Sequence, residues 1–127
     1  MSVVLTVQRN VKLDSEQYNT SSEDFTGSSG DKVSVAVPAL STSWPVPGWG
    51  GFQSANLQAI WFTSDVACTL TFVAAGTVAV PISLLAGGTF LWTNTDGGPN
   101  PFGTDDIIGL EITCTAAANI IGRTCVG

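Results

Sequence analysis

The chain of 127 residues contains no histidine, and its 4 basic residues stand against 10 acidic ones, which gives a formal net charge of -6. Histidine is the usual general base and the commonest metal ligand, so its absence removes the side chain on which many catalytic and metal sites depend. So few basic side chains cannot neutralise a run of phosphates. We therefore expect no nucleic-acid partner, no metal and no cofactor.

Charge of either sign is scarce, at 11% of the residues, where a soluble domain typically has roughly 25%. The apolar share of 44% is ordinary. It excludes disorder for most of the chain, because disordered segments combine low hydrophobicity with high net charge. Most of the charged residues lie within residues 1–32. Two interpretations of the nearly neutral remainder stay open: a surface rich in Thr and Ser, or a surface that is largely an interface.

Apolar side chains alternate with polar ones in several short segments, which is the pattern of half-buried β-strands. In residues 67–73, for example, Cys68, Leu70 and Phe72 fall on one face. A later segment places on one face Ile108, Leu110, Ile112 and Cys114. No window has the apolar spacing of an amphipathic helix. The sequence predicts an all-β fold, a single antiparallel β-sandwich or jelly roll of about eight strands with an N-terminal arm.

The expected strands cover residues 3–7, 33–37, 57–63, 67–73, 78–85, 89–92, 107–115 and 119–126. Pro81 indicates an edge strand or a bulge, because proline cannot donate a hydrogen bond to a neighbouring strand. Within a single domain overall, we expect residues 1–32 to form an N-terminal strand or arm with a polar loop. Residues 33–127 are expected to form the β-sandwich.

Three segments do not have the pattern of strands. Residues 14–31 are polar and rich in Ser and Gly, which predicts a long loop or a mobile arm. Residues 41–56 are apolar but interrupted by Pro and Gly, and residues 94–106 are polar and rich in turn residues. Asp65, which lies between two expected strands, is predicted to be a turn residue.

Residues 66–95 carry no charge, so the segment could be mistaken for a membrane span. Its alternation of polar and apolar residues and its regularly spaced Gly and Pro argue instead for strands, and we expect no membrane partner. The N-terminal residues have neither the basic region nor the cleavage site of a secretory signal.

Residues 96–106 hold three carboxylates and an amide, and superficially resemble a calcium loop. Pro101 stands where an EF-hand requires glycine, and Ile107 stands where it requires a bidentate glutamate. A turn capped by Asp and Asn side chains is therefore the better interpretation. The neighbours Asp105 and Asp106 point to opposite faces if the segment is extended, so they cannot form an acid–base pair. We expect no catalytic residue, and a protein that is not an enzyme.

The three cysteines, Cys68, Cys114 and Cys125, are widely spaced and lie within expected strands. Without histidine or a Cys-x-x-Cys motif they form neither a zinc site nor an activated nucleophile. A bridge between Cys114 and Cys125 is conceivable if the two C-terminal strands form a hairpin, but a short turn near Ala117 would place Cys114 opposite about Ile121 rather than opposite Cys125. We therefore expect buried free thiols, and synthesis in a reducing compartment.

The four tryptophans divide into two groups. Trp61 and Trp92 lie in apolar strands and are expected in the core. Trp44 and Trp49 lie in the segment rich in Pro and Gly. Their rings either fold back over the end of the sandwich or stand out, where they could stack on sugar rings or bind a neighbouring protein.

The second half of the chain also shows an ordered set of short motifs. They are Leu-Gln-Ala-Ile-Trp-Phe-Thr-Ser-Asp at 57–65, Leu-Leu-Ala-Gly at 84–87, Phe-Leu-Trp at 90–92, Asn-Pro-Phe at 100–102, and Asp106 before a strand at 107–115. In their order and spacing, residues 57–126 resemble small tailed-phage virion proteins of jelly-roll type. The resemblance implies a capsid decoration or cement subunit without catalytic residues, made in the bacterial host's cytoplasm and located on the capsid exterior.

We therefore expect a non-enzymatic protein that binds neighbouring shell subunits of a phage head and stabilises the shell. Its expected partners are the major capsid protein and further copies of itself, as a dimer or trimer. One candidate interface is the segment with Trp44, Trp49 and Phe52. The other is the N-terminal arm, with candidate residues Val3, Leu5, Arg9, Lys12 and Tyr18. Such an arm could pair with the sheet edge of another chain.

A different class of function remains as an alternative. In a carbohydrate-binding module or receptor-binding tip, Trp44 and Trp49 would form a stacking platform. The partners of the sugar hydroxyls would then be Asp96, Asn100 or Asp105.

Overall fold

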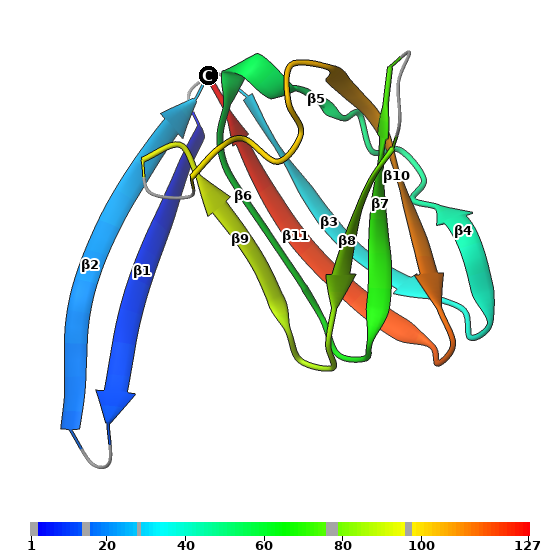
Figure 1. The fold of residues 1–127 in the computed structure, drawn as a ribbon, viewed down its shortest axis with the longest axis horizontal. Helices are drawn as coiled ribbons and strands as arrows, with labels where there is room; N and C mark the ends of the chain where they lie inside the picture. Colours follow the sequence, from blue (N-terminus) through cyan, green and yellow to red (C-terminus); the bar gives the residue numbers. More distant parts are fainter. Residues whose placement is uncertain (1–2, 14–15, 28, 76–78, 96–97) are drawn as a thin grey trace.

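The computed structural model describes residues 3–13, 16–27, 29–75, 79–95 and 98–127, and for residues 3, 9–13 and 16–23 it describes the backbone alone. Two antiparallel sheets face each other and enclose the core (Figure 1). Sheet I contains, in spatial order, β3 (Ser29–Val37), β11 (Ala118–Val126), β6 (Leu57–Ser64) and β9 (Thr89–Thr93). Sheet II contains β4 (Ser41–Pro45), β10 (Asp106–Cys114), β7 (Cys68–Ala74) and β8 (Val80–Leu84). The prediction of an all-β sandwich is confirmed.

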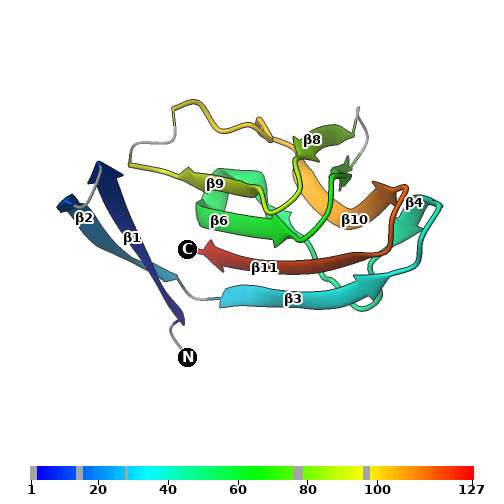
Figure 2. The same ribbon diagram turned by 90° about the horizontal axis from the view of Figure 1, so that it is seen from below.

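The remaining elements attach to these sheets. The short β5 (Phe52–Gln53) pairs with β10 and leads into the helical turn η1 (Ser54–Asn56). The strands β1 (Val3–Leu13) and β2 (Glu16–Gly27) form an antiparallel hairpin that joins the sandwich at one end and stands apart from it elsewhere (Figures 1 and 2). Within the described ranges, no helix has the length and apolar character that crossing a bilayer demands.

The strands of the sandwich pair in a nested order. The outermost strands in the sequence, β3 and β11, pair with each other, and inside them β4 pairs with β10. Further inside, β6 pairs with β9, and the innermost strands β7 and β8 also pair. Residues 29–126 therefore fold as one long antiparallel ribbon. The additional pairs β6–β11 and β7–β10 close this ribbon into two sheets.

The core is centred on aromatic rings between the sheets. The ring of Phe72, on β7, lies edge-on to three other rings, with centroid distances of 5.6 Å to Phe62, 5.0 Å to Phe102 and 6.0 Å to Trp49. Phe62 and Phe72 are fully buried. Edge-to-face contacts of this kind add to the stabilisation from burial. Phe72 therefore joins both sheets and the loop before β10.

Several local predictions are confirmed. Cys68, Leu70 and Phe72 are buried on the inner face of β7, as the period of two predicts. Pro81 lies in β8, the edge strand of sheet II. Residues 94–106 connect β9 to β10. In this connection the side-chain oxygen of Asn100 accepts the backbone N–H of Phe102 at 2.9 Å, so the predicted cap of a turn is present.

The predictions for two polar or broken segments are wrong. Residues 14–31 are not a loop, because they contain β2 and the beginning of β3. The sequence of β2 shows no apolar alternation, since the hairpin contacts the sandwich only near its base and neither face of its outer part has to enter the core. Residues 41–56 likewise contain β4, β5 and η1.

Two predictions about β10 also fail. A β-bulge between Ile107 and Gly109 reverses the alternation, so Ile107 is buried whereas Ile108 is 59% exposed. The predicted hairpin between the two C-terminal strands is absent, because β10 lies in sheet II and β11 lies in sheet I. Cys114 and Cys125 are consequently not on adjacent strands. All three cysteines are free and buried, as expected.

Asp65 lies in the turn between β6 and β7, as predicted. Its Oδ1 accepts the backbone N–H of Asn119 at 2.8 Å, and its Oδ2 accepts the side-chain amide of Asn119 at 2.9 Å. The backbone hydrogen bond first, and the side-chain hydrogen bond second, hold the pKa of Asp65 below its ordinary value. The carboxylate thereby ties this turn to the start of β11.

We expect Asp65→Asn to be less stable than the wild type at pH 7, with a difference that shrinks in acid. A carboxyl group whose pKa is lowered by folding stabilises the protein above its unfolded pKa of about 4, and this stabilisation is lost as the pH falls through the folded pKa. Urea unfolding midpoints measured at neutral and acidic pH test this. Asn119→Ala removes only the side-chain hydrogen bond and keeps the backbone one, so it should give the same pattern with a smaller difference. A difference that does not change with pH would contradict this account.

Candidate protein interface

The base of the hairpin packs on the outer face of sheet I. Val7 and Phe25 of the hairpin are buried against Ala59 of β6 and Cys125 of β11, and Leu5 packs against the same cluster. The thiol of Cys125 donates to the carbonyl of Phe25, with a sulfur–oxygen distance of 3.3 Å. Burial raises the pKa of this thiol. The hairpin is thus attached through a small apolar cluster of its own, separate from the main core.

A glycine at the end of β2 permits this attachment. A Cβ added to Gly27 would lie 2.2 Å from the carbonyl oxygen of Val126. Real side chains do not approach backbone atoms so closely, so only glycine lets the end of β2 run directly against β11.

Beyond this base a recess opens between the hairpin and sheet I. It has a volume of about 330 Å³ and is lined by Leu5, Thr6, Val7, Gln8, Trp61, Leu91 and Arg123. We call these seven residues the hairpin wedge. Figure 1 shows the hairpin diverging from β9 and β6 below this point.

The floor of the hairpin wedge is one row of cross-strand neighbours. Arg123 is the register partner of Lys32 on one side and of Trp61 on the other, and Trp61 in turn is opposite Leu91. Ile121, one row further along β11, is exposed on the same face. Lys32 and Arg123 are the two basic residues of the chain outside the hairpin. The face therefore combines apolar side chains with the positive charge of the sandwich.

The structure corrects the first predicted interface segment. Trp49 and Phe52 are 9% and 7% exposed, and their rings pack together at a centroid distance of 5.9 Å. The indole N–H of Trp49 has no hydrogen-bond partner among the described residues. These two rings fold back into the core and are not free to act as contact anchors. Trp44 is half-buried on β4 and also packs against the core.

The interface candidates of the N-terminal arm lie in different parts of the hairpin. Leu5 lines the hairpin wedge. Arg9, Lys12 and Tyr18 lie in the outer part of the hairpin, where their register partners are Ser21, Gln17 and Val11. The side chains of these three residues, and that of Val3, lie outside what the structure describes.

Sequence reasoning missed Trp61, which it placed in the core. On β6 the side chains of Ile60 and Phe62 are fully buried, so the half-buried Trp61 points to the opposite, outer face. The signal available in the sequence was parity, because two adjacent residues of a strand cannot both face the same core.

The alternative sugar-binding platform does not assemble in the described residues. Trp49 is in the core, as noted above, which leaves Trp44 without its predicted partner. Asn100 uses its side-chain N–H on the carbonyl of Ser54, at 2.8 Å, and its oxygen on its own turn. Asp96 lies outside the described residues. Among the described residues, Trp49 and Asn100 are therefore not available for the predicted contacts with a sugar.

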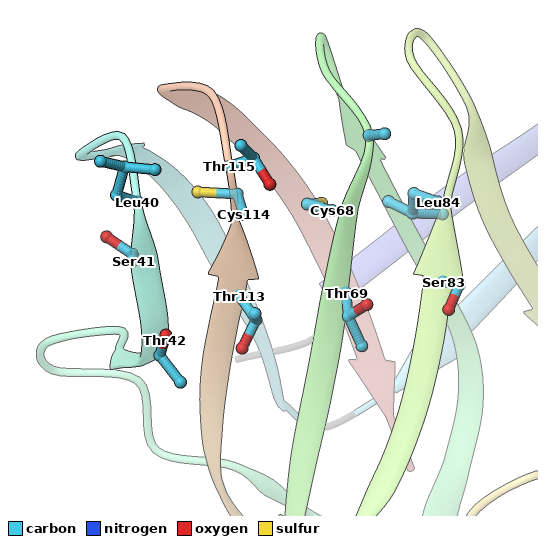
Figure 3. Close-up of a pocket in the computed structure, with 11 residues that line it drawn as sticks. Leu40, Ser41, Thr42, Cys68, Thr69, Ser83, Leu84, Thr113, Cys114 and Thr115 are labelled. Atoms are coloured by element: carbon cyan, nitrogen blue, oxygen red, sulfur yellow. The ribbon is translucent and has the colours of Figure 1, made fainter.

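A second recess lies on sheet II, at the end of the sandwich that carries the β10–β11 turn. It has a volume of about 540 Å³, and its lining includes Thr69, Ser83, Thr113, Cys68 and Cys114, which Figure 3 shows on neighbouring strands. Burial raises the pKa of Cys68, against the effect of a hydrogen bond with Ser64. Within the described ranges, no cluster of three or more potential metal ligands is present.

We expect Phe25→Ala to expose Cys125 to thiol reagents. Removing the ring leaves a cavity in a cluster of only a few side chains, and truncation of a buried Phe typically costs about 3–5 kcal/mol. In a Cys68→Ala/Cys114→Ala background, the rate at which a maleimide modifies Cys125 should rise at least about tenfold. Val4→Ala, at an exposed position of β1, should leave the rate unchanged. Equal rates for all of these proteins would mean that the hairpin does not cover Cys125.

The chain was compared with protein-family models, curated proteins and solved structures, and none of them matches it.

Proposed function

We propose that the protein is a non-enzymatic structural protein of a tailed-phage virion, a decoration or cement subunit that binds the major capsid protein on the outside of the head. The observation that carries the proposal is the hairpin wedge, an open recess that joins Trp61 and Leu91 to the guanidinium of Arg123. Aromatic and Arg side chains are the types enriched in binding hot spots. On the major capsid protein, the surface that binds the hairpin wedge would carry an apolar side chain for Trp61 and Leu91 and a neighbouring carboxylate for Arg123.

The strand order supports a virion protein by analogy of fold. The nested pairs β3–β11, β4–β10, β6–β9 and β7–β8 support the interpretation of the sandwich as a jelly roll, in which one antiparallel ribbon wraps into two four-stranded sheets. Jelly rolls occur in viral capsid domains and also in lectins. Because one fold serves many functions, the hairpin wedge, and not the fold, supports attachment to the capsid.

Each bound subunit stabilises the shell through the summed free energy of its contacts with the shell subunits. A subunit that binds only the assembled shell stabilises that state by mass action, without chemistry. A symmetric dimer or trimer would present several hairpin wedges at once, and linked contacts hold more strongly than single ones. Buried free thiols agree with synthesis in the reducing cytoplasm of a bacterial host.

The test is the composition of purified heads of the phage that encodes the chain. Quantitative mass spectrometry should find the protein at a copy number close to that of the shell subunit. Heads assembled without it should lose their contents at a lower temperature, and should regain resistance when the purified protein is added. Absence from the heads, or presence only in traces, would overturn the proposal.

A further inference from the structure

Two of the three cysteines lie directly opposite each other on neighbouring strands of sheet II. Cys68 begins β7 and Cys114 ends β10, and the two are register partners. Both side chains are on the inner face, 8% and 6% exposed. Figure 3 shows them side by side on adjacent strands. Cys125 is far from this pair in the fold, under the hairpin on sheet I.

Antiparallel strands contain hydrogen-bonded and non-hydrogen-bonded residue pairs, and a hydrogen bond on the β4 side of β10 shows which kind Cys68 and Cys114 form. The carbonyl of Leu110 accepts the N–H of Val46, just after β4, at 2.9 Å. Alternate residues of a strand direct their backbone groups to the same neighbour, so Cys114, four residues later, also faces β4. Between Gly109 and Cys114 the register with β7 is uninterrupted. Cys68 and Cys114 therefore form a non-hydrogen-bonded pair.

Non-hydrogen-bonded pairs are the closer of the two kinds in an antiparallel sheet. Their Cα atoms lie about 4.5 Å apart, and disulfides need a Cα separation of roughly 4.4–6.8 Å. In the structure the thiol of Cys114 donates to the carbonyl of Pro38, at 3.5 Å, and Cys68 interacts with Ser64. Rotation about χ1 moves each sulfur atom away from its present partner and toward the other strand.

The pair is also close to solvent. Both cysteines are among the residues that line the recess of about 540 Å³ at this end of sheet II. Their side chains are on the inner face, and the pair lies at the ends of its two strands and not in the middle of the sheet. The two thiols also interact electrostatically. Burial is the main cause that raises the pKa of Cys68, and repulsion from the thiolate of Cys114 raises it further.

We propose that Cys68 and Cys114 are a disulfide-forming site, reduced when the protein is made and closed by a low-molecular-weight disulfide when it meets an oxidising medium. The closed bond fastens the two central strands of sheet II at the end where the recess opens. The site is independent of the proposed attachment face, because it lies on the other sheet.

The reaction proceeds by thiol–disulfide exchange with oxidised glutathione as the oxidant. The thiolate of one cysteine attacks a glutathione sulfur, breaks its S–S bond and releases one glutathione thiolate. The thiolate of the second cysteine then attacks the mixed disulfide and releases the second glutathione. The two cysteines lose two electrons and two protons in total, and oxidised glutathione becomes two molecules of reduced glutathione.

The experiment uses the full chain, reduced, and then equilibrated in mixtures of reduced and oxidised glutathione at about pH 8, where a thiolate fraction exists. Samples are quenched in acid, alkylated with a maleimide after unfolding, and weighed intact. The expected product carries a maleimide on Cys125 alone, and peptide mapping should link Cys68 to Cys114. Its urea unfolding midpoint should exceed that of the reduced protein, and a phosphine reductant should reverse the difference.

Matched variants identify the bond. Cys125→Ala should still form it, and Cys114→Ala should not. Three alkylated cysteines under the most oxidising mixture would overturn the proposal. So would a link that involves Cys125, or a glutathione adduct on Cys68 or Cys114 that never resolves. All of these readings come from the wild type or from single substitutions, and they do not depend on the identity of a binding partner.

Discussion

Replacing Phe72 with alanine is expected to lower the free energy of unfolding by about 3–5 kcal/mol, the range typical of a large aromatic residue removed from a packed core. Phe72 is fully buried, and its ring contacts Phe62, Phe102 and Trp49. The three contacts come from sheet I, from the connection before β10 and from the segment after β4. The cavity would therefore open at the junction of three parts of the fold. Because a domain is typically stable by only about 5–15 kcal/mol, the variant should be close to unfolding.

Urea unfolding followed by tryptophan fluorescence measures this effect, since Trp49 contacts the Phe72 ring. Phe72→Leu keeps much of the volume and should lose clearly less stability. Ile108→Ala, at a position 59% exposed by the β-bulge, should change stability by no more than about 0.5 kcal/mol. A loss below about 1 kcal/mol for Phe72→Ala would mean that the site collapses around the cavity or that the ring contacts are not those described.

The features that the sequence predicts correctly are those that depend on neighbouring residues. The alternation of Cys68, Leu70 and Phe72 is sufficient to predict β7, because every second side chain of a strand between the core and solvent faces the core. Pro81 marked an edge strand because its missing N–H would be unpaired in a central one. Asn100 and Asp65 marked turns through the hydrogen bonds that short polar side chains make to backbone N–H groups.

The features that the sequence does not predict depend on contacts distant in the chain. The bulge that exposes Ile108 has no local signal that distinguishes it from regular alternation. The polar β2 is a strand because β1 pairs with it, and β2 itself has no apolar alternation that would mark this pairing. Trp61 was placed in the core because its neighbours Ile60 and Phe62 are apolar. Parity along the strand places Trp61 on the face opposite to both neighbours, and the hairpin that covers part of the outer face explains why an apolar ring lies there.

The pairing of the cysteines likewise depends on contacts that are distant in the chain. From the sequence, Cys114 had Cys125 as its nearest partner, since both lie in the C-terminal segment. The connection after β10 crosses to the other sheet, so Cys114 instead faces Cys68, which is much earlier in the chain. A candidate disulfide pair thus follows from strand order, which local patterns do not contain.

The second large effect concerns attachment, and it rests on the proposed function. We expect Trp61→Ala to weaken binding to heads that lack the protein by about thirtyfold or more, the loss that corresponds to a hot-spot contribution of about 2 kcal/mol. Trp61 forms the floor of the hairpin wedge between Arg123 and Leu91. Its removal deletes the largest apolar surface that a shell side chain could contact there. Because Trp61 is outside the main core, the variant should keep a cooperative unfolding transition.

Arg123→Glu tests the charged half of the same surface. Reversal of this charge next to Lys32 should weaken binding as well, and the loss should be smaller at high salt, where exposed charges are screened. Binding is measured as the fraction of added protein that sediments with the heads over a series of concentrations. Ile108→Ala serves as the control, because Ile108 is an exposed apolar residue on sheet II. If Ile108→Ala reduced binding as strongly as Trp61→Ala, the attachment face would be sheet II. If neither variant did so while the protein still bound, the contact would lie outside the hairpin wedge.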